Sequence, residues 1–302
     1  MSILANHTQT PRATTQTDTD PPVGTSMRKK SIQSRIVSYV VLVLGSLAFL
    51  FPLAWLVSTS LKTQDQILVY PIQWLPDPVN WSNYVDLFDV APFGRYLLNT
   101  VLLTVGGVAG SLIGSSIAAY AFAKLRFPGR DVFFMVMLAT LMVPSWATLI
   151  PSYVLFARIG WLDSFAPILV PALFAAPFNT FLLRQFFLSI PNELDEAAKI
   201  DGASTFRIFW SIALPMARPA LIIVALFSFL TYWNEYLLPL VYLQSDDKYP
   251  LSVGVANFIG LQNQDFALAM TGAAIAIAPC LILFFIAQRW FIQGVVITGV
   301  KG

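Results

Sequence analysis

Side chains that commonly carry catalysis are scarce in this chain. Its 302 residues include one histidine, His7, and one cysteine, Cys280, so a His-based metal site, a nucleophilic triad or an internal disulfide is not expected. Three neighbouring carboxylates, Glu193, Asp195 and Glu196, are expected to form a solvated helix face rather than an acid–base pair. The sequence lacks a phosphate-binding Gly-x-x-x-x-Gly-Lys-[Ser/Thr] loop. The chain is therefore predicted to be no enzyme and to hold no metal or cofactor of its own.

A second group of chemically capable residues lies inside apolar runs. An ionisable residue in a membrane span is a functional candidate by default, and aromatic rings beside amides suit the apolar face and the hydroxyls of a sugar. The alternative to a functional role for the one carboxylate, Glu235, is that it lies at the membrane interface in contact with water. The predicted substrate-pathway residues are Asn179, Tyr232, Trp233, Asn234 and Glu235.

The composition indicates which solvent surrounds these residues. Hydrophobic residues make up 57% of the chain and charged residues 11%, whereas a soluble domain carries roughly 25% charged residues. The mean hydropathy is +0.69. So little charge cannot cover a water-facing surface, so we expect membrane lipid to surround the chain. The net charge of +2 gives no indication of a nucleic-acid partner, and none is predicted.

Six apolar runs are each long enough to be a membrane span. About 20 residues at a rise of 1.5 Å cross a hydrocarbon core of roughly 30 Å, and backbone groups in lipid must be satisfied within a helix. Prolines inside the runs, such as Pro144, are expected to kink them. The predicted fold is all-α and polytopic, with transmembrane helices at residues 36–61, 96–123, 132–157, 164–183, 219–241 and 266–288.

The distribution of Lys and Arg predicts the orientation. With a cytoplasmic N-terminus, 14 of the 18 Lys and Arg residues lie in inner segments and 4 in outer ones, as the positive-inside rule requires. Both termini of this multi-pass protein are then cytoplasmic. Residues 1–32 are predicted to be a disordered cytoplasmic tail. The outer segments, including a polar loop at 242–265, could receive a soluble partner or anchor the chain at the interface.

The segment Pro191–Pro215 is a polar interruption between spans four and five. It is predicted to form two short amphipathic helices that meet at Asp201 and Gly202. Asn192 is a predicted N-cap, and Asp195 is expected to pair with Lys199 one turn later. Gly202 suits the left-handed position that ends a helix.

The second helix of this segment is expected to carry one apolar stripe of Phe206, Phe209, Trp210 and Ala213. A helix pair with an acidic tip and an apolar base could dock into a cleft of a partner. The alternative is a surface loop that lies along the membrane. Because the chain has no nucleotide site, ATP could act on it only through such a partner.

A stripe of small residues lies within the second span. Gly106, Gly110 and Gly114 recur every four residues, a spacing that lets two helices approach closely. Packing within the chain is the expected use, and an interface with a second subunit is the alternative.

The segment between spans four and five resembles the EAA loop of ABC-importer permeases. That loop reads Glu-Ala-Ala, three residues, Gly, nine residues, Ile, any residue, Leu-Pro. Residues 120–130, 233–240 and 299–302 further resemble the carbohydrate-uptake, maltose-type branch of these permeases, and the resemblance covers residues 33–302. The matching positions of the loop are Glu196, Ala197, Ala198, Gly202, Ile212, Leu214 and Pro215.

The resemblance implies a permease domain at 33–302 in an ATP-driven, binding-protein-dependent sugar importer that works by alternating access. It also implies that this importer lies in a prokaryotic inner or plasma membrane. A di- or oligosaccharide is the expected substrate. A polyol or glycerol-phosphate compound, or an ion-coupled secondary transporter, is the alternative. The implied partners are a homodimeric or heterodimeric ATPase that binds ATP and Mg, a second homologous permease subunit, an extracytoplasmic sugar-binding protein and membrane lipid.

The resemblance also implies which residues contact the ATPase. The C-terminal residues Val300, Lys301 and Gly302 are implied to reach towards it. The implied ATPase-coupling residues are Leu194, Asp195, Glu196, Ala197, Ala198, Ile200, Asp201, Gly202, Ala203, Thr205, Ile212, Leu214 and Pro215.

Overall fold

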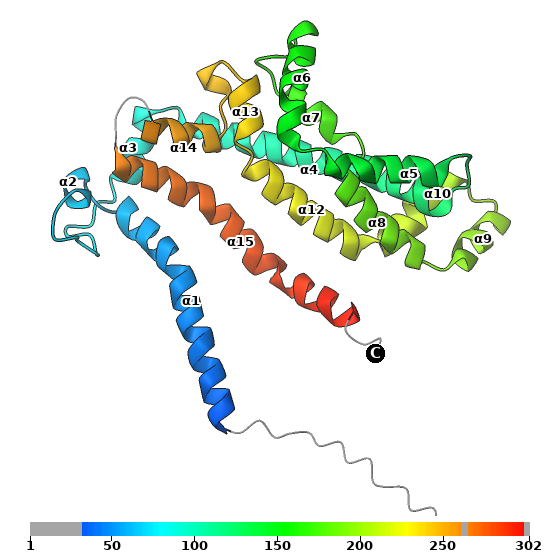
Figure 1. Ribbon diagram of the computed structural model, residues 1–302, viewed down its shortest axis with the longest axis horizontal. Helices are drawn as coiled ribbons and strands as arrows, with labels where there is room; N and C mark the ends of the chain where they lie inside the picture. Colours follow the sequence, from blue (N-terminus) through cyan, green and yellow to red (C-terminus); the bar gives the residue numbers. More distant parts are fainter. Residues whose placement is uncertain (1–31, 261–264, 299–302) are drawn as a thin grey trace, which may run out of the picture. The chain divides into compact units, whose positions relative to one another are not determined.

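The computed structural model describes residues 32–260 and 265–298, and every regular element in these ranges is helical (Figure 1). The predicted N-terminal tail, apart from its last residue, and the C-terminal residues Val300, Lys301 and Gly302 lie outside the described residues. The chain divides into two units, 1–50 and 51–302. The second unit holds all the sites considered below.

The helices in chain order are α1 (Ile32–Ser60), α2 (Gln64–Ile67), α3 (Asn83–Val90), α4 (Phe93–Lys124), α5 (Arg130–Ala139), η1 (Thr140–Met142), α6 (Ser145–Arg158), α7 (Ala166–Ala172), α8 (Pro177–Ser189), α9 (Asn192–Ile200), α10 (Thr205–Ile208), the π-helix η2 (Phe209–Ala213), α11 (Leu214–Met216), α12 (Arg218–Trp233), α13 (Leu237–Tyr242), η3 (Asp246–Lys248), α14 (Leu251–Gly260) and α15 (Phe266–Thr298).

Four helical stretches in the described residues are long and apolar enough to cross a membrane, or up to six if each of two bent pairs is one span. This supports a polytopic helical membrane protein. Large apolar side chains of α1 face outward, with Phe49 87% exposed, as contact with lipid or a neighbouring helix requires. The four unbent stretches are Ser34–Ser60, Phe93–Lys124, Ala166–Ser189 and Phe266–Gln288.

Three of the predicted continuous spans are interrupted in the structure: the third between η1 and α6, the fourth between α7 and α8, and the fifth between α12 and α13. The third bends by 101° between η1 and α6, and the fifth is preceded by a 79° bend between α11 and α12. Pro144 lies in the first break, and Val143 before it is extended, with ψ 117°. Proline lacks an N–H and disfavours helical backbone at the preceding residue. The expected kink is therefore a complete break between two helices. The fifth helix also ends early, at Trp233.

The segment 242–265 was predicted to be a polar loop, and this prediction is wrong for its middle part. Residues Leu251–Gly260 form α14, and the side chains of Leu251 and Val253 are almost fully buried. Ten residues are too few to span a bilayer. The helix instead packs against α4 and α15, so its apolar residues serve a local core.

The glycine stripe of α4 packs within the chain, as expected. A Cβ atom placed on Gly110 would lie 3.1 Å from the carbonyl carbon of Ala172 in α7, and one on Gly114 would meet the backbone carbonyl of Leu173. Helices α8 and α12 also lie along α4 (Figure 1). The intramolecular use of the stripe is therefore confirmed, and α4 is the helix around which the second unit is built.

Candidate functional site

Helix α9 begins at Asn192, and the residue in the N-cap position is Pro191, which makes no side-chain cap. The predicted N-cap role of Asn192 is therefore wrong. Its Oδ1 atom instead accepts a hydrogen bond from Lys124 Nζ at 3.0 Å. The side chain turns towards α4 because the lysine at the end of that helix offers a charged donor.

Asp195 is paired with Lys124 rather than with Lys199, which corrects the second prediction for this helix. The Asp195 Oδ2 and Lys124 Nζ atoms are 3.1 Å apart, and the two side chains are 11% and 4% exposed. Lys124 Nζ also donates to the carbonyl oxygen of Ile190 at 2.7 Å. Its three N–H groups thus have three acceptors. Removal of either partner would leave a buried charge, at a cost of about 3–5 kcal/mol.

The two halves of the Pro191–Pro215 loop meet at Gly202, as predicted. Its φ angle is +78°, in the region that only glycine adopts freely. Its N–H donates to Lys199 O at 3.0 Å, and the N–H of Ala203 donates to Ala198 O at 2.9 Å. This is the hydrogen-bond pattern of a Schellman motif. Helix α9 therefore has a defined end that fixes its direction relative to α10.

The apolar stripe of the second half is only partly buried. Phe209 and Ala213 are 7% and 1% exposed, but Phe206 and Trp210 are 71% and 63% exposed. The latter two rings stack on each other, with centroids 6.4 Å apart. The chain packs along one edge of the predicted apolar stripe, at Phe209 and Ala213, and leaves the other edge, Phe206 and Trp210, open.

Most of the predicted coupling residues are exposed. They form a surface in which acidic groups lie next to apolar side chains, and Ile200 is 86% exposed. Asp195 alone of the set is buried, so it acts inside the chain. Contact with an ATPase stays a prediction for the others. The exposed ones are Leu194, Glu196, Ala197, Ile200, Asp201, Gly202, Thr205 and Pro215, and the half-buried ones are Ala198, Ala203, Ile212 and Leu214.

Lys124 is the residue of this site that sequence reasoning missed. In the sequence, Lys124 served only as one of the Lys and Arg residues that predict the orientation. Its position at the C-terminal end of a long helix, where a cation is favoured, was a usable signal. Nearby, the ring of Tyr120 lies 5.0 Å from that of Phe209 and 5.8 Å from that of Phe187. The end of α4 therefore contacts both halves of the loop.

A second polar site lies at the other end of α4. Asp163, whose φ is 55°, accepts hydrogen bonds from the backbone N–H groups of Gln244 and Ser245 at 3.0 and 2.9 Å. Lys248 Nζ lies 2.7 Å from its Oδ2, and the Ser245 hydroxyl also donates to it. We call these four residues the Asp163 cluster. The bonds from Lys248 and Ser245 hold the pKa of the Asp163 carboxyl well below its ordinary value.

Replacing Asp163 with Asn is expected to loosen residues 244–248 without unfolding the chain, because the amide loses its charge pairing with Lys248. Amide hydrogen exchange of this segment should then speed up. In the wild type the contribution of the carboxylate is complete above its ordinary pKa of about 4 and is lost as the pH falls below it. Protection corrected for intrinsic exchange should therefore be constant between about pH 5 and about pH 8.

The matched control for this prediction is Asp247→Asn. Asp247 lies 3.7 Å from Arg95, and both side chains are more than half exposed, so this surface pair adds little. Equal exchange rates in the two variants would contradict the role given to Asp163.

Helix α4 also holds the segment that follows the Asp163 cluster. The Asn99 amide donates to the carbonyl oxygens of Asp247 and Tyr249 at 2.9 and 3.0 Å. The Thr100 hydroxyl accepts from the Leu251 N–H at 2.8 Å. A pocket of about 490 Å³ with both charged and apolar walls opens here, lined by Arg95, Leu98, Asn99, Leu102, Asp163, Ser164, Phe165, Asp247 and Lys248.

The structure does not gather the predicted substrate-pathway residues into one pocket. Asn179 is buried and donates to Ser228 Oγ at 3.2 Å. Asn234 donates to the carbonyl oxygen of Leu230 in its own helix, and Glu235 accepts from the N–H of Leu238. Sugar contact by these residues stays a prediction.

The two aromatic members of this group have structural partners. The Trp233 indole donates to Ala276 O at 2.9 Å, which joins α12 to α15. The ring of Tyr232 occupies the space beside Gly107, where a Cβ atom would collide with it. Both side chains therefore help pack α12, whatever they do for a substrate.

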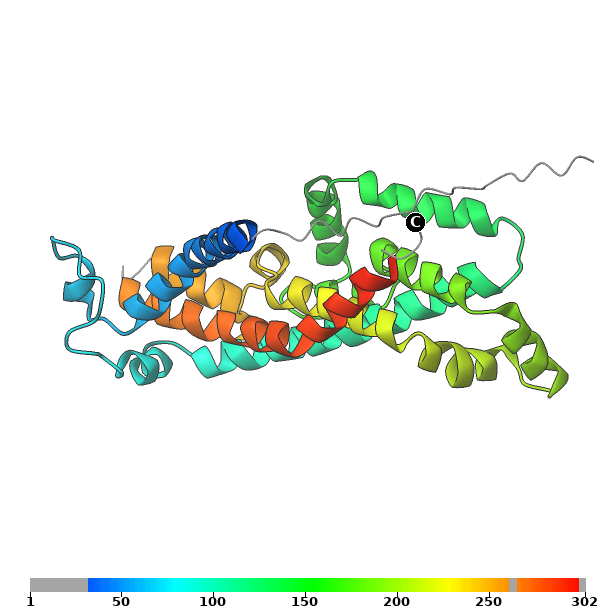
Figure 2. The ribbon, with the colours of Figure 1, turned by 90° about the horizontal axis from the view of Figure 1, so that it is seen from below.

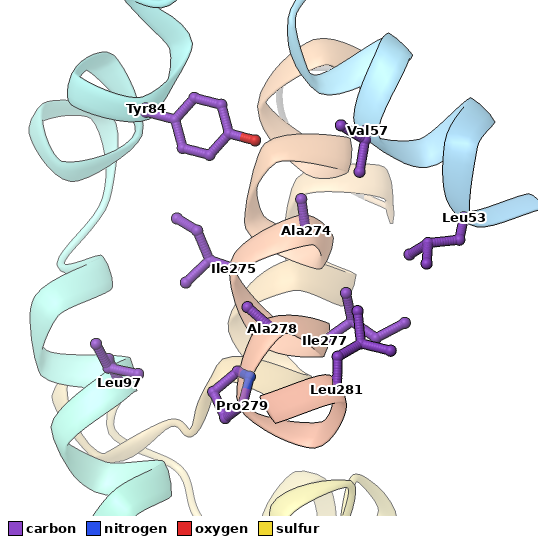
Figure 3. A pocket seen from close by; sticks show the side chains of 10 residues that line it. All are labelled: Leu53, Val57, Tyr84, Leu97, Ala274, Ile275, Ile277, Ala278, Pro279 and Leu281. Atoms are coloured by element: carbon purple, nitrogen blue, oxygen red, sulfur yellow. The ribbon is translucent and has the colours of Figure 1, made fainter. Parts of the chain in front are cut away.

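Two larger grooves in the described residues are apolar. One, of about 520 Å³, lies between the end of α1, Tyr84, Leu97 and α15 (Figure 3). The other, of about 570 Å³, lies among α4, α12 and α15. Of its lining residues, Thr104 and Trp233 carry a polar group in the side chain. Such walls suit acyl chains or other helices and offer a sugar few hydrogen bonds.

These features define a class: a polytopic helical membrane protein, with a two-helix loop held at one end of its central span. A family model described as "Binding-protein-dependent transport system inner membrane component" matches residues 110–297. The chain belongs to this family, whose members are permease subunits of ABC importers and not enzymes.

Individual relatives agree with this assignment. The diacetylchitobiose uptake system permease NgcG of Streptomyces coelicolor is 34% identical over 256 residues, 84% of each chain. The arabinooligosaccharide permease AraQ of Halalkalibacterium halodurans is 32% identical, over 91% of this chain and all of its own. The sn-glycerol-3-phosphate permease UgpE of Pectobacterium atrosepticum is 33% identical, over 86% of this chain and 95% of its own.

A solved structure shares the fold. A chain of a bacterial ABC transporter involved in the import of the acidic polysaccharide alginate superposes with a TM-score of 0.78 at 29% identity. The match covers 87% of this chain and 98% of the other. A chain from the alginate transporter in complex with its pentasaccharide-bound periplasmic protein has a TM-score of 0.62 at 18% identity and supports the fold alone.

Proposed function

We propose that this chain is a permease subunit for a di- or oligosaccharide, with six spans and both termini in the cytoplasm. The observation that carries the proposal is the full-length similarity to permeases named for diacetylchitobiose and arabinooligosaccharides, together with a structural neighbour from an alginate importer. The excess of Lys and Arg on one side supports the orientation.

A glycerol-phosphate substrate is the second candidate, because UgpE is about as similar as the sugar permeases. Recognition of a phosphate ester needs cations such as Arg or Lys. The six apolar runs contain neither, and their polar groups are mostly amides, hydroxyls and rings. Amides and rings suit the hydroxyls and apolar face of a neutral sugar, so we favour the saccharide.

The coupling to ATP is proposed to run through the exposed face of the Pro191–Pro215 loop. Two ATPase subunits, which would bind ATP and Mg, dock on residues such as Glu196 and Ile200 and move the loop when they close. The C-terminal residues Val300, Lys301 and Gly302 extend this contact. A second permease subunit forms the other half of the pathway, and a soluble sugar-binding protein docks near the Asp163 cluster at the outer surface.

The substrate class is tested by purifying the complex through a tag on this chain and measuring uptake into proteoliposomes together with its binding protein. Uptake of a labelled neutral disaccharide or oligosaccharide is expected, with unlabelled sn-glycerol 3-phosphate failing to compete. Uptake of glycerol 3-phosphate, with no competition from any neutral saccharide in a panel of hexose and pentose oligomers, would reject the saccharide in favour of the second candidate.

A further inference from the structure

Helix α4 is continuous over 32 residues and contains no proline. At 1.5 Å per residue it extends for about 48 Å, longer than the hydrocarbon core of a bilayer. Helix α9 lies at one end of it and α14 at the other (Figures 1 and 2). By contrast, the chain bends by 101° between η1 and α6, at Pro144, and by 79° between α11 and α12. An unbroken helix passes a displacement from end to end with less loss than a bent one.

At the loop end, two contacts one helical turn apart hold α4 to both halves of the loop. Lys124 pairs with Asp195 of α9 at 3.1 Å. Tyr120 packs its ring against Phe209 of the π-helix, with centroids 5.0 Å apart. Inserted π turns often occur at functional sites. A movement of the loop therefore reaches α4 through a buried charge pair and a ring contact.

At the other end, α4 is bonded directly to the backbone of the segment around η3 and α14. Asn99 holds the carbonyl oxygens of Asp247 and Tyr249, and Thr100 accepts from the N–H of Leu251. Asn99 and Thr100 are both at most 4% exposed. The bonds that join α4 to this segment are therefore made by two buried side chains of α4 itself, and not by flexible side chains on the surface.

We propose that Lys124 is a positioning residue for transport. Its ion pair with Asp195 fixes α9 to α4, so that a displacement of the loop is carried along α4 to residues 246–251. This rests on the proposed function, in which ATPase subunits move the loop. The Lys124 side chain is 4% exposed and does not contact the ATPase itself. It acts through Asp195.

The test uses the whole complex, purified through a tag on this chain and reconstituted with its binding protein and sugar. Lys124→Met keeps the apolar stem and removes the charge. We expect the ATPase to co-purify in wild-type amounts with unchanged basal hydrolysis. Stimulation by the sugar-loaded binding protein should fall by about 5- to 150-fold, the usual range of an allosteric coupling. Lys124→Arg should retain most of the stimulation, because it keeps the charge and the donors.

Arg126→Met is the matched control, because Arg126 is an exposed cation two residues after Lys124 that lies outside the Pro191–Pro215 loop, so this variant should lose nothing. Asp195→Asn should lower the stimulation as Lys124→Met does, and the double variant should be no worse than the more impaired single one, since both remove the same pair. If the Lys124→Met chain does not fold or insert into the membrane, Asp195→Asn and Lys124→Arg give the same readout.

Wild-type stimulation in Lys124→Met, or strictly additive losses in the double variant, would overturn the proposal and leave the proposed function intact. Loss of the ATPase from the Lys124→Met complex would also overturn it, because Lys124 would then support docking. A wild-type chain that never co-purifies with an ATPase would instead overturn the proposed function.

Discussion

Replacement of Gly202 by proline is expected to abolish sugar-stimulated ATP hydrolysis while the chain still inserts into the membrane. Proline fixes φ near −65°, whereas Gly202 has a φ of +78°. Proline also lacks the N–H that bonds to Lys199 O. Helix α9 would lose its Schellman end and its direction relative to α10. The spans themselves are unaffected, because the substitution lies between them.

Two companion variants make this prediction specific. Gly202→Ala is the matched control, because alanine occupies the left-handed region at a cost of roughly 1–2 kcal/mol and should keep most of the stimulation. Glu196→Lys leaves the backbone intact and reverses the charge of an exposed residue in the docking face, so it should abolish stimulation as well. Stimulated turnover at the wild-type level in both Gly202→Pro and Glu196→Lys would contradict the role of the loop.

The second large effect is expected on stability, at Gly114 of α4. A Cβ atom at this position would lie 2.8 Å from the carbonyl carbon of Leu173 and would also meet its oxygen. Both atoms belong to the backbone of Leu173, the residue that directly follows α7. The end of α7 and α4 must therefore separate to admit even one methyl group. Overpacking of this kind costs about 1–3 kcal/mol. Gly114→Ala should therefore lower the thermal unfolding midpoint of the detergent-solubilised chain and reduce the folded yield.

The control for this variant is Gly45→Ala, since a Cβ atom at Gly45 meets nothing within 4 Å. Its unfolding midpoint should equal or exceed that of the wild type, because alanine favours a helix more than glycine does. A Gly114→Ala chain that unfolds at the same temperature as the Gly45→Ala chain would show that α4 and α7 do not pack through this glycine.

The apolar helices and the turn at Gly202 were predictable because their signals are local. A run of about 20 apolar residues must be helical in lipid, and a glycine after a helical segment favours a left-handed end. The small-residue spacing of α4 likewise indicated close packing. Each signal lies within one stretch of sequence, so the tertiary structure had little opportunity to override it.

The buried charge pair at the loop was not predictable from the sequence. Lys124 is 66 to 68 residues away from the acceptors Ile190 and Asn192, and only the packing of α4 against α8 brings them together. Asp195 had a nearer cation in Lys199 at a favourable helical spacing. A partner on another helix prevailed because it lies in a buried site, where the charge of Asp195 needs compensation.

The π-helix and α14 were missed for a related reason. Periodicity marks the face of the second loop helix but does not reveal which edge the core covers, so Phe206 and Trp210 were placed with Phe209 and Ala213. A ten-residue apolar run such as Leu251–Gly260 is too short for a span and is ambiguous on its own. Its place against α4 depends on bonds from Thr100 and Asn99, which are distant in sequence.

We propose that the chain moves its substrate with energy from ATP that is hydrolysed on partner subunits. The most direct measurement is sugar uptake by proteoliposomes that contain the complex, with ATP inside and all ion gradients collapsed by ionophores. We expect uptake to continue under these conditions, to require the binding protein and to stop when ATP is withheld. Uptake that persists without ATP and follows an imposed ion gradient would contradict the account and indicate a secondary transporter.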